Sequence, residues 1–182
     1  DWSAFFDGGD EFYVRFENDE TKAVAFGEIT DNDDGTYAVS FRTTAAGSYT
    51  CSILIGDEEH VADSPYPVRI LPARPFPKRC QISGEGHRVA TTLETAFFYV
   101  EAFDRHGNAV QGNIGDHLPL NVTITSHDDE ITEVDICDTG EGRYKMSFTP
   151  SKKGFYRVVV ESSGVHIGQS PYSLQVRSNE SP

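Results

Sequence analysis

The feature that most constrains this chain is an internal repeat. Residues 33–41 (DDGTYAVSF) match 140–148 (GEGRYKMSF) at an offset of 107 positions, and 47–49 (GSY) match 154–156 (GFY) at the same offset. At an offset of 106, the triplet SPY at 64–66 recurs at 170–172. Self-similarity at one period indicates two copies of a structural unit rather than one large domain.

Within each copy, apolar residues alternate with polar ones at a period of two, which is typical of a strand with one buried face. In the second copy this alternation recurs in segments 98–102, 118–124, 144–148 and 156–160, and turn-forming residues separate the segments. No long segment has helical periodicity. Short strands at this spacing predict an all-β fold, an antiparallel β-sandwich.

The boundary between the copies is rich in proline, since Pro72, Pro75 and Pro77 follow one another closely. Proline disfavours helix and central strand and stiffens a connection. We therefore predict a first unit at 1–72, a Pro-rich linker at 73–78 and a second unit at 79–178.

The first copy is predicted to be incomplete. Aligning the copies leaves 79–106 of the second without a counterpart in the first, so the first would lack its two N-terminal strands and expose apolar residues. A soluble monomer rarely exposes a large apolar surface. We expect the missing strands to come from upstream sequence or from another chain.

The charge of the chain argues against two classes of partner. Lys and Arg number 15 against 29 Asp and Glu, which gives a net charge of -14. This charge disfavours nonspecific binding to nucleic acid or to an anionic membrane surface. Residues 1–72 contain four basic and 15 acidic residues, so most of the charge belongs to the first copy. No apolar run reaches the ~18 residues of a membrane span, and we expect protein partners.

Motifs for chemistry are few. The three cysteines, Cys51, Cys80 and Cys137, lack metal-site spacing and favour reduced thiols, although one bridge stays open as an alternative. The acidic segment 31–35 is similar to the start of a calcium loop, but Arg42 occupies its twelfth position. The six histidines show no zinc spacing, and no nucleophile motif occurs. We predict no catalytic residue, no metal, no cofactor and no enzymatic activity.

Several ordered motifs together resemble the filamin-type immunoglobulin-like repeat. They are the strand at 33–41 and 140–148, the G-x-Y-x-V-x-V strand at 154–160, the closing S-P-Y-x-L-x-V strand at 170–176, and the opening segment 80–86 with its turn at 104–108. His87 stands where many members of the family have leucine. The resemblance implies tandem seven-stranded sandwiches, the second complete and the first N-terminally incomplete, and no catalysis.

The resemblance also implies that partners bind by adding a strand beside the C strand, in the groove between C and D. In the second copy these strands correspond to 118–126 and 130–137, and an unpaired edge is a template for strand addition. The predicted partner contacts are the apolar residues of these two segments: Leu118, Leu120, Val122, Ile124, Ile131, Val134 and Ile136. The alternative is an edge that is merely protected by charge, because five acidic residues crowd 128–135.

Two functional interpretations follow, and they differ in compartment. One is an intracellular, cytoskeletal scaffold segment, as in filamin-like actin-associated proteins. The other is part of an extracellular cell-adhesion ectodomain, as in gamete-attachment membrane proteins with filamin repeats. The sequons at Asn121 and Asn179 favour the second, and the odd number of cysteines favours the first. Asn121 is predicted to face outward, where a glycan would hinder docking at the C/D edge.

Overall fold

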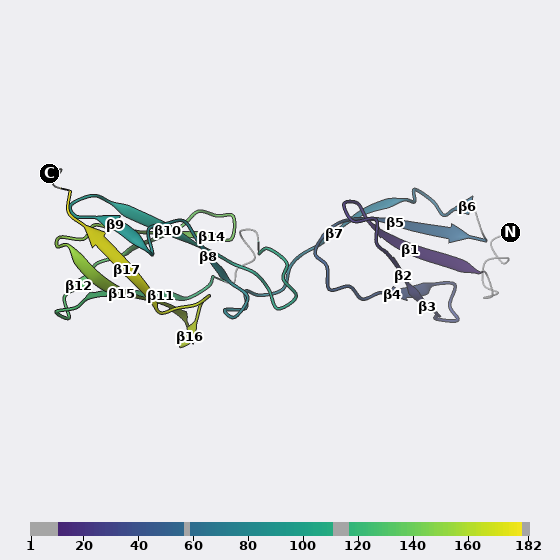
Figure 1. The fold of residues 1–182 in the computed structure, drawn as a ribbon. Coiled ribbons are helices and arrows are strands. Elements are labelled where there is room, and N and C mark those ends of the chain that lie inside the picture. Colours follow the sequence, from purple (N-terminus) through teal and green to yellow (C-terminus); the bar gives the residue numbers. More distant parts are fainter. Residues whose placement is uncertain (1–10, 57–58, 111–116, 180–182) are drawn as a thin grey trace. The chain divides into compact units, whose positions relative to one another are not determined.

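The computed structural model describes residues 11–56, 59–110 and 117–179, and these residues form strands and turns without a helix. The chain divides into two compact units, Asp1–Leu71 (unit 1) and Pro72–Pro182 (unit 2). Each unit contains two β-sheets (Figure 1). The predicted all-β architecture of tandem sandwiches is confirmed.

Unit 2 contains both layers of a sandwich. The first sheet has the order β13-β14-β10-β8, with antiparallel neighbours. Its strands are β8 (Gln81–Ser83), β10 (Ala96–Glu101), β13 (Asp135–Asp138) and β14 (Arg143–Phe148).

The second sheet of unit 2 has the order β12-β11-β15-β17-β9, and β16 pairs with β15. Its strands are β9 (Val89–Thr91), β11 (Leu120–Ser126), β12 (Ile131–Thr132), β15 (Gly154–Ser162), β16 (Val165–His166) and β17 (Tyr172–Arg177). The four alternating segments predicted as strands are therefore β10, β11, β14 and β15.

The core of unit 2 follows from this alternation, because every second side chain of a strand points to the same face. Phe98, Met146 and Val158 have no exposed surface, and burying such a side chain stabilises a fold by about 1.5–3 kcal/mol. Two tyrosines fill the core while their hydroxyls reach its rim. The hydroxyl of Tyr156 donates to the carbonyl of Lys152 at 2.8 Å, and that of Tyr144 accepts from the amide of Leu118 at 3.1 Å.

Unit 1 repeats only part of this arrangement. One sheet has the order β2-β1-β5-β6, with β7 paired to β5, and the other consists of β3 and β4. The strands are β1 (Phe12–Asn18), β2 (Val24–Phe26), β3 (Glu28–Asp31), β4 (Tyr37–Ser40), β5 (Gly47–Ile55), β6 (Glu59–His60) and β7 (Tyr66–Ile70).

Among the described residues, β4 of unit 1 has fewer strand neighbours than its counterpart in unit 2. Its counterpart in unit 2, β14, pairs with β10 along six residues, whereas β4 pairs only with β3 among the described residues. Val39 occupies the position of Met146 and is 42% exposed, while Met146 is fully buried. The buried cluster of the described part of unit 1 is correspondingly small and consists of Val14, Phe16, Tyr49 and Cys51.

The segment predicted as a linker, 73–78, is tied to unit 2. The amide of Phe76 donates to the carbonyl of Phe103 at 2.8 Å, and the amide of Ala73 donates to Asp104 Oδ2 at 3.0 Å. Asp104 is 1% exposed. Proline thus stiffens a segment that hydrogen bonds also hold against the turn after β10.

All three cysteines are free, as the sequence favoured. Cys51 and Cys80 are buried, and burial raises the pKa of both thiols, while Cys137 is exposed on β13. Cys51 lies in the core of unit 1.

Candidate interaction site

The outer edge of β11 is covered by another strand only over part of its length. On one side β15 pairs with all seven residues of β11, from Leu120 to Ser126. On the other side β12 pairs only with Ile124 and Thr125, and the amide of Ser126 donates to the carbonyl of Glu130 at 2.9 Å. The first half of β11 has no strand beside it on that side in the described part of the chain.

The direction of the backbone groups of β11 follows from these bonds. Along an antiparallel strand, successive residues direct their amides and carbonyls to alternate sides. Ser126 directs its amide toward β12, so Leu120 and Val122 direct theirs to the same, open side. Val160, opposite Val122, agrees with this because its amide bonds Ser170 Oγ at 2.8 Å and its carbonyl accepts from Ile167 at 2.9 Å, away from β11.

Apolar side chains line the space between this open edge and β13. Leu120, Val122 and Val134 are half-buried and pack against the core of unit 2. Ile136 pairs with the fully buried Met146 and therefore faces the interior of the sandwich, yet it is 42% exposed. Such an inward-facing but exposed side chain is one that the side chains of the facing sheet do not cover. We call Leu120, Val122, Val134 and Ile136 the C/D groove.

The other three predicted contacts lie elsewhere. Leu118 and Ile124 are 5% and 0% exposed and belong to the core, so a docked chain does not reach their side chains in this conformation. Ile131 is 70% exposed, but it pairs with Thr125 and points to the outer face of the sheet. Sequence alternation assigned inward residues correctly along β11 but did not show where the groove ends. The hairpin that covers Ile124 was missed, although the turn at 126–130 followed by an apolar residue is a hairpin signal.

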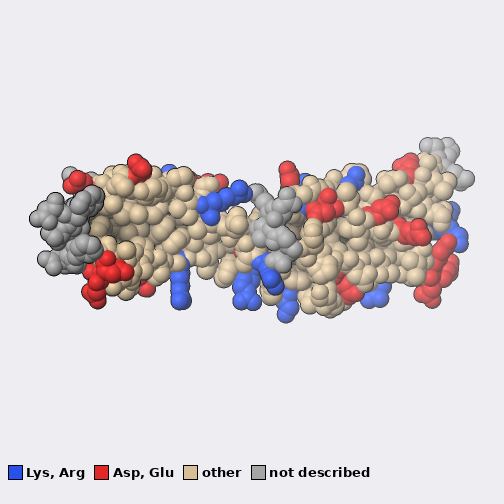
Figure 2. All heavy atoms as spheres, turned by 180° about the vertical axis from the view of Figure 1, so that it is seen from behind, with Lys and Arg blue, Asp and Glu red and all other residues tan. Residues whose placement is uncertain are grey.

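Acidic side chains surround the C/D groove. Asp128, Asp129, Glu133 and Asp135 are exposed, and Glu130 pairs with Lys152 Nζ at 2.8 Å. Figure 2 shows acidic and basic side chains interspersed on the visible face of each unit. The electrostatics of this edge favour a partner with basic residues beside its apolar ones.

The two sequons lie on the surface. Asn121 is exposed on the outer face of β11, as predicted, and its Nδ2 donates to Glu161 Oε1 at 2.9 Å. Asn179 is exposed after β17, and its amide donates to Thr92 Oγ1 at 3.1 Å. The last residue of the second sequon, Ser181, lies outside the described residues.

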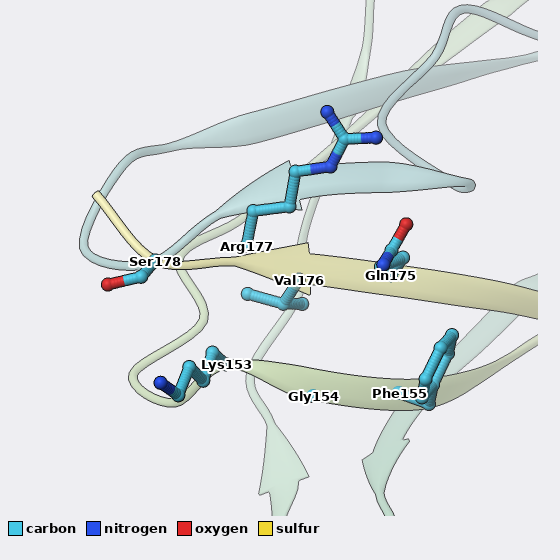
Figure 3. A pocket seen from close by; sticks show the side chains of 7 residues that line it. All are labelled: Lys153, Gly154, Phe155, Gln175, Val176, Arg177 and Ser178. Carbon is cyan, nitrogen blue, oxygen red and sulfur yellow. The ribbon is translucent and has the colours of Figure 1, made fainter. Parts of the chain in front are cut away.

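A shallow hollow on unit 2 has no set of groups for acid–base or nucleophilic chemistry. Figure 3 shows it between the start of β15 and the end of β17. Its lining consists of Lys153, Gly154, Phe155, Gln175, Val176, Arg177 and Ser178. No carboxylate, histidine or cysteine is among these residues, so a general acid–base pair is missing.

The acidic segment 31–35 uses its carboxylates within its own turn. Asp31 Oδ1 accepts from the amide of Asp33 at 2.8 Å, and Asp34 Oδ1 accepts from the amide of Thr36 at 3.0 Å and from its hydroxyl. These bonds from Thr36 lower the pKa of Asp34. Within 11–56, 59–110 and 117–179, no three His, Cys, Asp or Glu side chains gather as metal ligands would, and no helix is long and apolar enough to span a membrane.

Comparison with known proteins gives one consistent family. The family model described as "Filamin/ABP280 repeat" matches residues 6–67 and 74–173. Filamin-C of Rattus norvegicus is 29% identical over 150 residues, which are 81% of this chain and 5% of that protein. The E3 ubiquitin-protein ligase TRIM45 of Mus musculus is 29% identical over 106 residues, which are 58% of this chain and 18% of that protein. The chain thus spans a small part of these relatives.

Among solved structures, the Lin-41 filamin domain has a similar fold. Its TM-score is 0.50 at 22% identity, and the match covers 58% of this chain and 98% of that domain. The share of this chain is that of one repeat, as expected when a single domain is aligned with one of two tandem copies.

Proposed function

The chain belongs to the filamin repeat family, and from this premise we propose that unit 2 binds proteins by accepting an extended segment as an additional strand along β11. Filamin repeats are structural and interaction modules without enzymatic activity. The observation that carries the proposal is the open backbone edge of Leu120 and Val122 beside the exposed, inward-facing Ile136.

Each part of the C/D groove has a role in this proposal. The backbone groups of Leu120 and Val122 pair with the partner strand and supply affinity without reading its sequence. Alternate partner side chains enter between the sheets against Val134 and Ile136 and supply selectivity. The remaining partner side chains point outward, where the acidic residues around the groove favour Lys or Arg. No catalytic step is proposed for this chain.

A synthetic peptide of alternating lysine and valine, KVKVKVK, tests this proposal, and KSKSKSK is the control of equal charge. Titrated into the isotopically labelled full chain, the first peptide is expected to shift the amide signals of 120–123 and 134–136. The control peptide is expected to leave them in place. Shifts confined to other residues, or equal shifts with both peptides, would contradict strand addition at β11.

A matched pair of substitutions separates the groove from the surface around it. Ile136→Ser removes the exposed apolar side chain of the groove, and Ile131→Ser makes the same change on the outer face. We expect the first to weaken KVKVKVK binding by about tenfold, since burial of one large aliphatic group is worth about 1.5–3 kcal/mol. The second is expected to leave binding unchanged. Equal losses would show that the peptide does not enter between the sheets.

The exposed sequon at Asn121 supports a second candidate, an adhesion module on the extracellular side of a membrane protein. The side chain lies on the outer face of β11 and is accessible to a glycosyltransferase. Expression in a secretory host followed by glycosidase treatment tests it. An occupied Asn121 would favour the extracellular role over the intracellular scaffold, and a folded, secreted but unglycosylated chain would weigh against it.

Unit 1 is proposed to take up a strand at a different place. The edge of β4 and the exposed inward-facing Val39 fit a strand with the alternation of β10, which covers Met146 in unit 2. A second copy of this chain is one source that can be tested directly. Sedimentation of the chain as given tests this source, because donation between copies gives a concentration-dependent dimer.

A further inference from the structure

The two units contain the same strand edge in different states, and their alignment is fixed by hydrogen bonds. Strands β1 and β11 both have seven residues, and each ends with an amide that donates across a turn, from Asn18 to Ala23 and from Ser126 to Glu130, both at 2.9 Å. Val14 in β1 therefore corresponds to Val122 in β11.

The strands on the other side of the groove align equally well. Strands β3 and β13 both have four residues, and Glu28 pairs with Ser40 as Asp135 pairs with Ser147. The residue immediately before each strand therefore occupies one equivalent position. It is Gly27 in unit 1 and Val134 in unit 2.

In unit 1 this position closes the edge. Strand β2 pairs with β1 from Arg15 to Glu17, and the amide of Gly27 then donates to the carbonyl of Val14 at 2.8 Å. The carbonyl that a partner strand would use is thus occupied by the chain itself. Ile29, which corresponds to Ile136, is half-buried and packs against the core cluster of unit 1.

This closure depends on the absence of a side chain. A Cβ atom placed on Gly27 would lie 2.6 Å from Val39 Cγ1 and 3.1 Å from Val14 Cβ. Contacts this short cannot persist, so a side chain at this position opposes the close approach to β1 that the bond to Val14 needs.

In unit 2 the equivalent residue has a side chain and the edge stays open. Val134 packs half-buried against the core, and among the described residues none donates a backbone hydrogen bond to the carbonyl of Val122. The residues across the groove are Val122 and Met146, and Met146 is larger than its counterpart Val39. The approach made by Gly27 is therefore blocked at Val134.

We infer that the residue before the D-type strand decides which unit accepts a partner strand: Gly27 closes the edge of unit 1, and Val134 holds that of unit 2 open. The inference rests on the proposed strand addition and names its selectivity between the units. We therefore expect a partner strand to bind along β11 and not along β1.

Two substitutions at one position separate closure from lost packing. Val134→Gly and Val134→Ala both remove the valine methyl groups, but only glycine permits the close approach. We expect Val134→Gly to weaken KVKVKVK binding and to slow hydrogen exchange of the amide at 134, each by about tenfold, the scale of one backbone hydrogen bond. Val134→Ala loses the same groove packing but leaves this hydrogen bond unformed, so we expect it to bind the peptide about threefold more tightly than Val134→Gly and to leave exchange at 134 within about twofold of the parent chain. Equal losses of binding in both variants would overturn the inference.

Hydrogen exchange at residue 27 tests the same idea in unit 1 without any peptide. The amide of Gly27 is expected to be protected in the parent chain, and the amide at this position is expected to exchange about tenfold faster in Gly27→Ala, because its bond to Val14 is lost. Unchanged exchange would overturn the closure. If exchange behaves as expected but the parent chain binds no peptide, the proposed strand addition fails while the steric closure stands, so the two failures are distinguishable.

Discussion

Asp104 offers the sharpest test of how the proline-rich segment is held to unit 2. Its carboxylate is 1% exposed and accepts four hydrogen bonds. The donors are the amides of His106 and Asn108, at 2.8 and 2.9 Å, the Asn108 Nδ2 at 2.8 Å, and the amide of Ala73 at 3.0 Å. Asp104→Asn keeps the shape of the side chain but replaces one acceptor oxygen by a donor.

The expected loss follows from the bonds that the amide cannot accept. Two of the four donors then face an NH2 group, and a hydrogen bond to a charged group contributes about 1.5–3 kcal/mol. Ala73 is exposed, so its amide regains water and part of the loss is offset. We expect Asp104→Asn to destabilise unit 2 by about 2–4 kcal/mol at pH 7. For a domain near 100 residues this lowers Tm by roughly 10 °C or more.

The stability difference between the parent chain and Asp104→Asn should depend on pH. Burial alone would raise the pKa of Asp104, but the hydrogen bonds from Asn108, Ala73 and His106 outweigh burial and lower it. A carboxyl whose pKa is lower in the folded state stabilises the fold above its unfolded pKa of about 3.9, and this contribution is lost as the pH falls through the folded pKa. The difference between parent and variant should therefore shrink as the pH is lowered from 5 to 2.

Two units unfold in one chain, so the measurement must report unit 2 alone. Urea unfolding followed by the amide signals of β10 and β15 meets this need. The control is Asp138→Asn, an exposed carboxylate that accepts one backbone bond from Gly140 at 2.8 Å and lies 3.3 Å from the exposed His117 Nδ1. Because both side chains are exposed, its effect should stay below about 0.5 kcal/mol. If Asp104→Asn costs no more than this control, or if its cost is the same at pH 5 and pH 2, the reasoning is refuted.

Three further predictions concern buried groups. His87 is 5% exposed, its Nδ1 has no partner among the described residues, and burial followed by the charge of Arg88 lowers its pKa, so unit 2 should lose stability as the pH falls below about 6.5. His87→Leu should flatten Tm between pH 7.5 and 5.5, and parallel slopes would contradict this assignment. A thiol reagent should modify the native chain once, at Cys137, and reach all three cysteines only after unfolding, as intact mass would show. Tyr156→Phe removes the 2.8 Å bond to a carbonyl and should cost about 1 kcal/mol in urea unfolding, so no measurable loss would mean that water replaces this bond.

The sequence predicted the strands well because their signal is local. Alternation at 98–102, 118–124, 144–148 and 156–160 depends only on which side chains share a face, and the four strands appear there. Tyr144 and Tyr156 begin two of these segments and are buried, as is Tyr49 in unit 1. Tyr37 is only half-buried, and its strand β4 has a described neighbour, β3, on one side only.

The boundaries of the candidate site were harder to predict because they depend on neighbours distant in the sequence. Every second side chain of segment 118–124 faces the interior of the sandwich, which applies to Leu118, Leu120, Val122 and Ile124. Whether such a side chain is free for a partner depends on what lies beside it. The amide of Leu118 donates to the Tyr144 hydroxyl, and the backbone of Ile124 pairs with β12. Alternation contains no information on either neighbour.

The difference between the two units also depends on neighbours that are distant in the sequence. The repeat places Gly27 opposite Val134, but only the distances from Gly27 to Val14 and Val39 show that a side chain there is incompatible with a closed edge. The open edges that we compare therefore lie on different strands of the two units. In unit 1, β4 has β3 on one side and no described strand on the other, while in unit 2 β10 pairs with the corresponding β14 and the start of β11 is open. Tandem copies of one fold therefore present two unlike templates, so a segment that pairs with one unit has no equivalent place on the other.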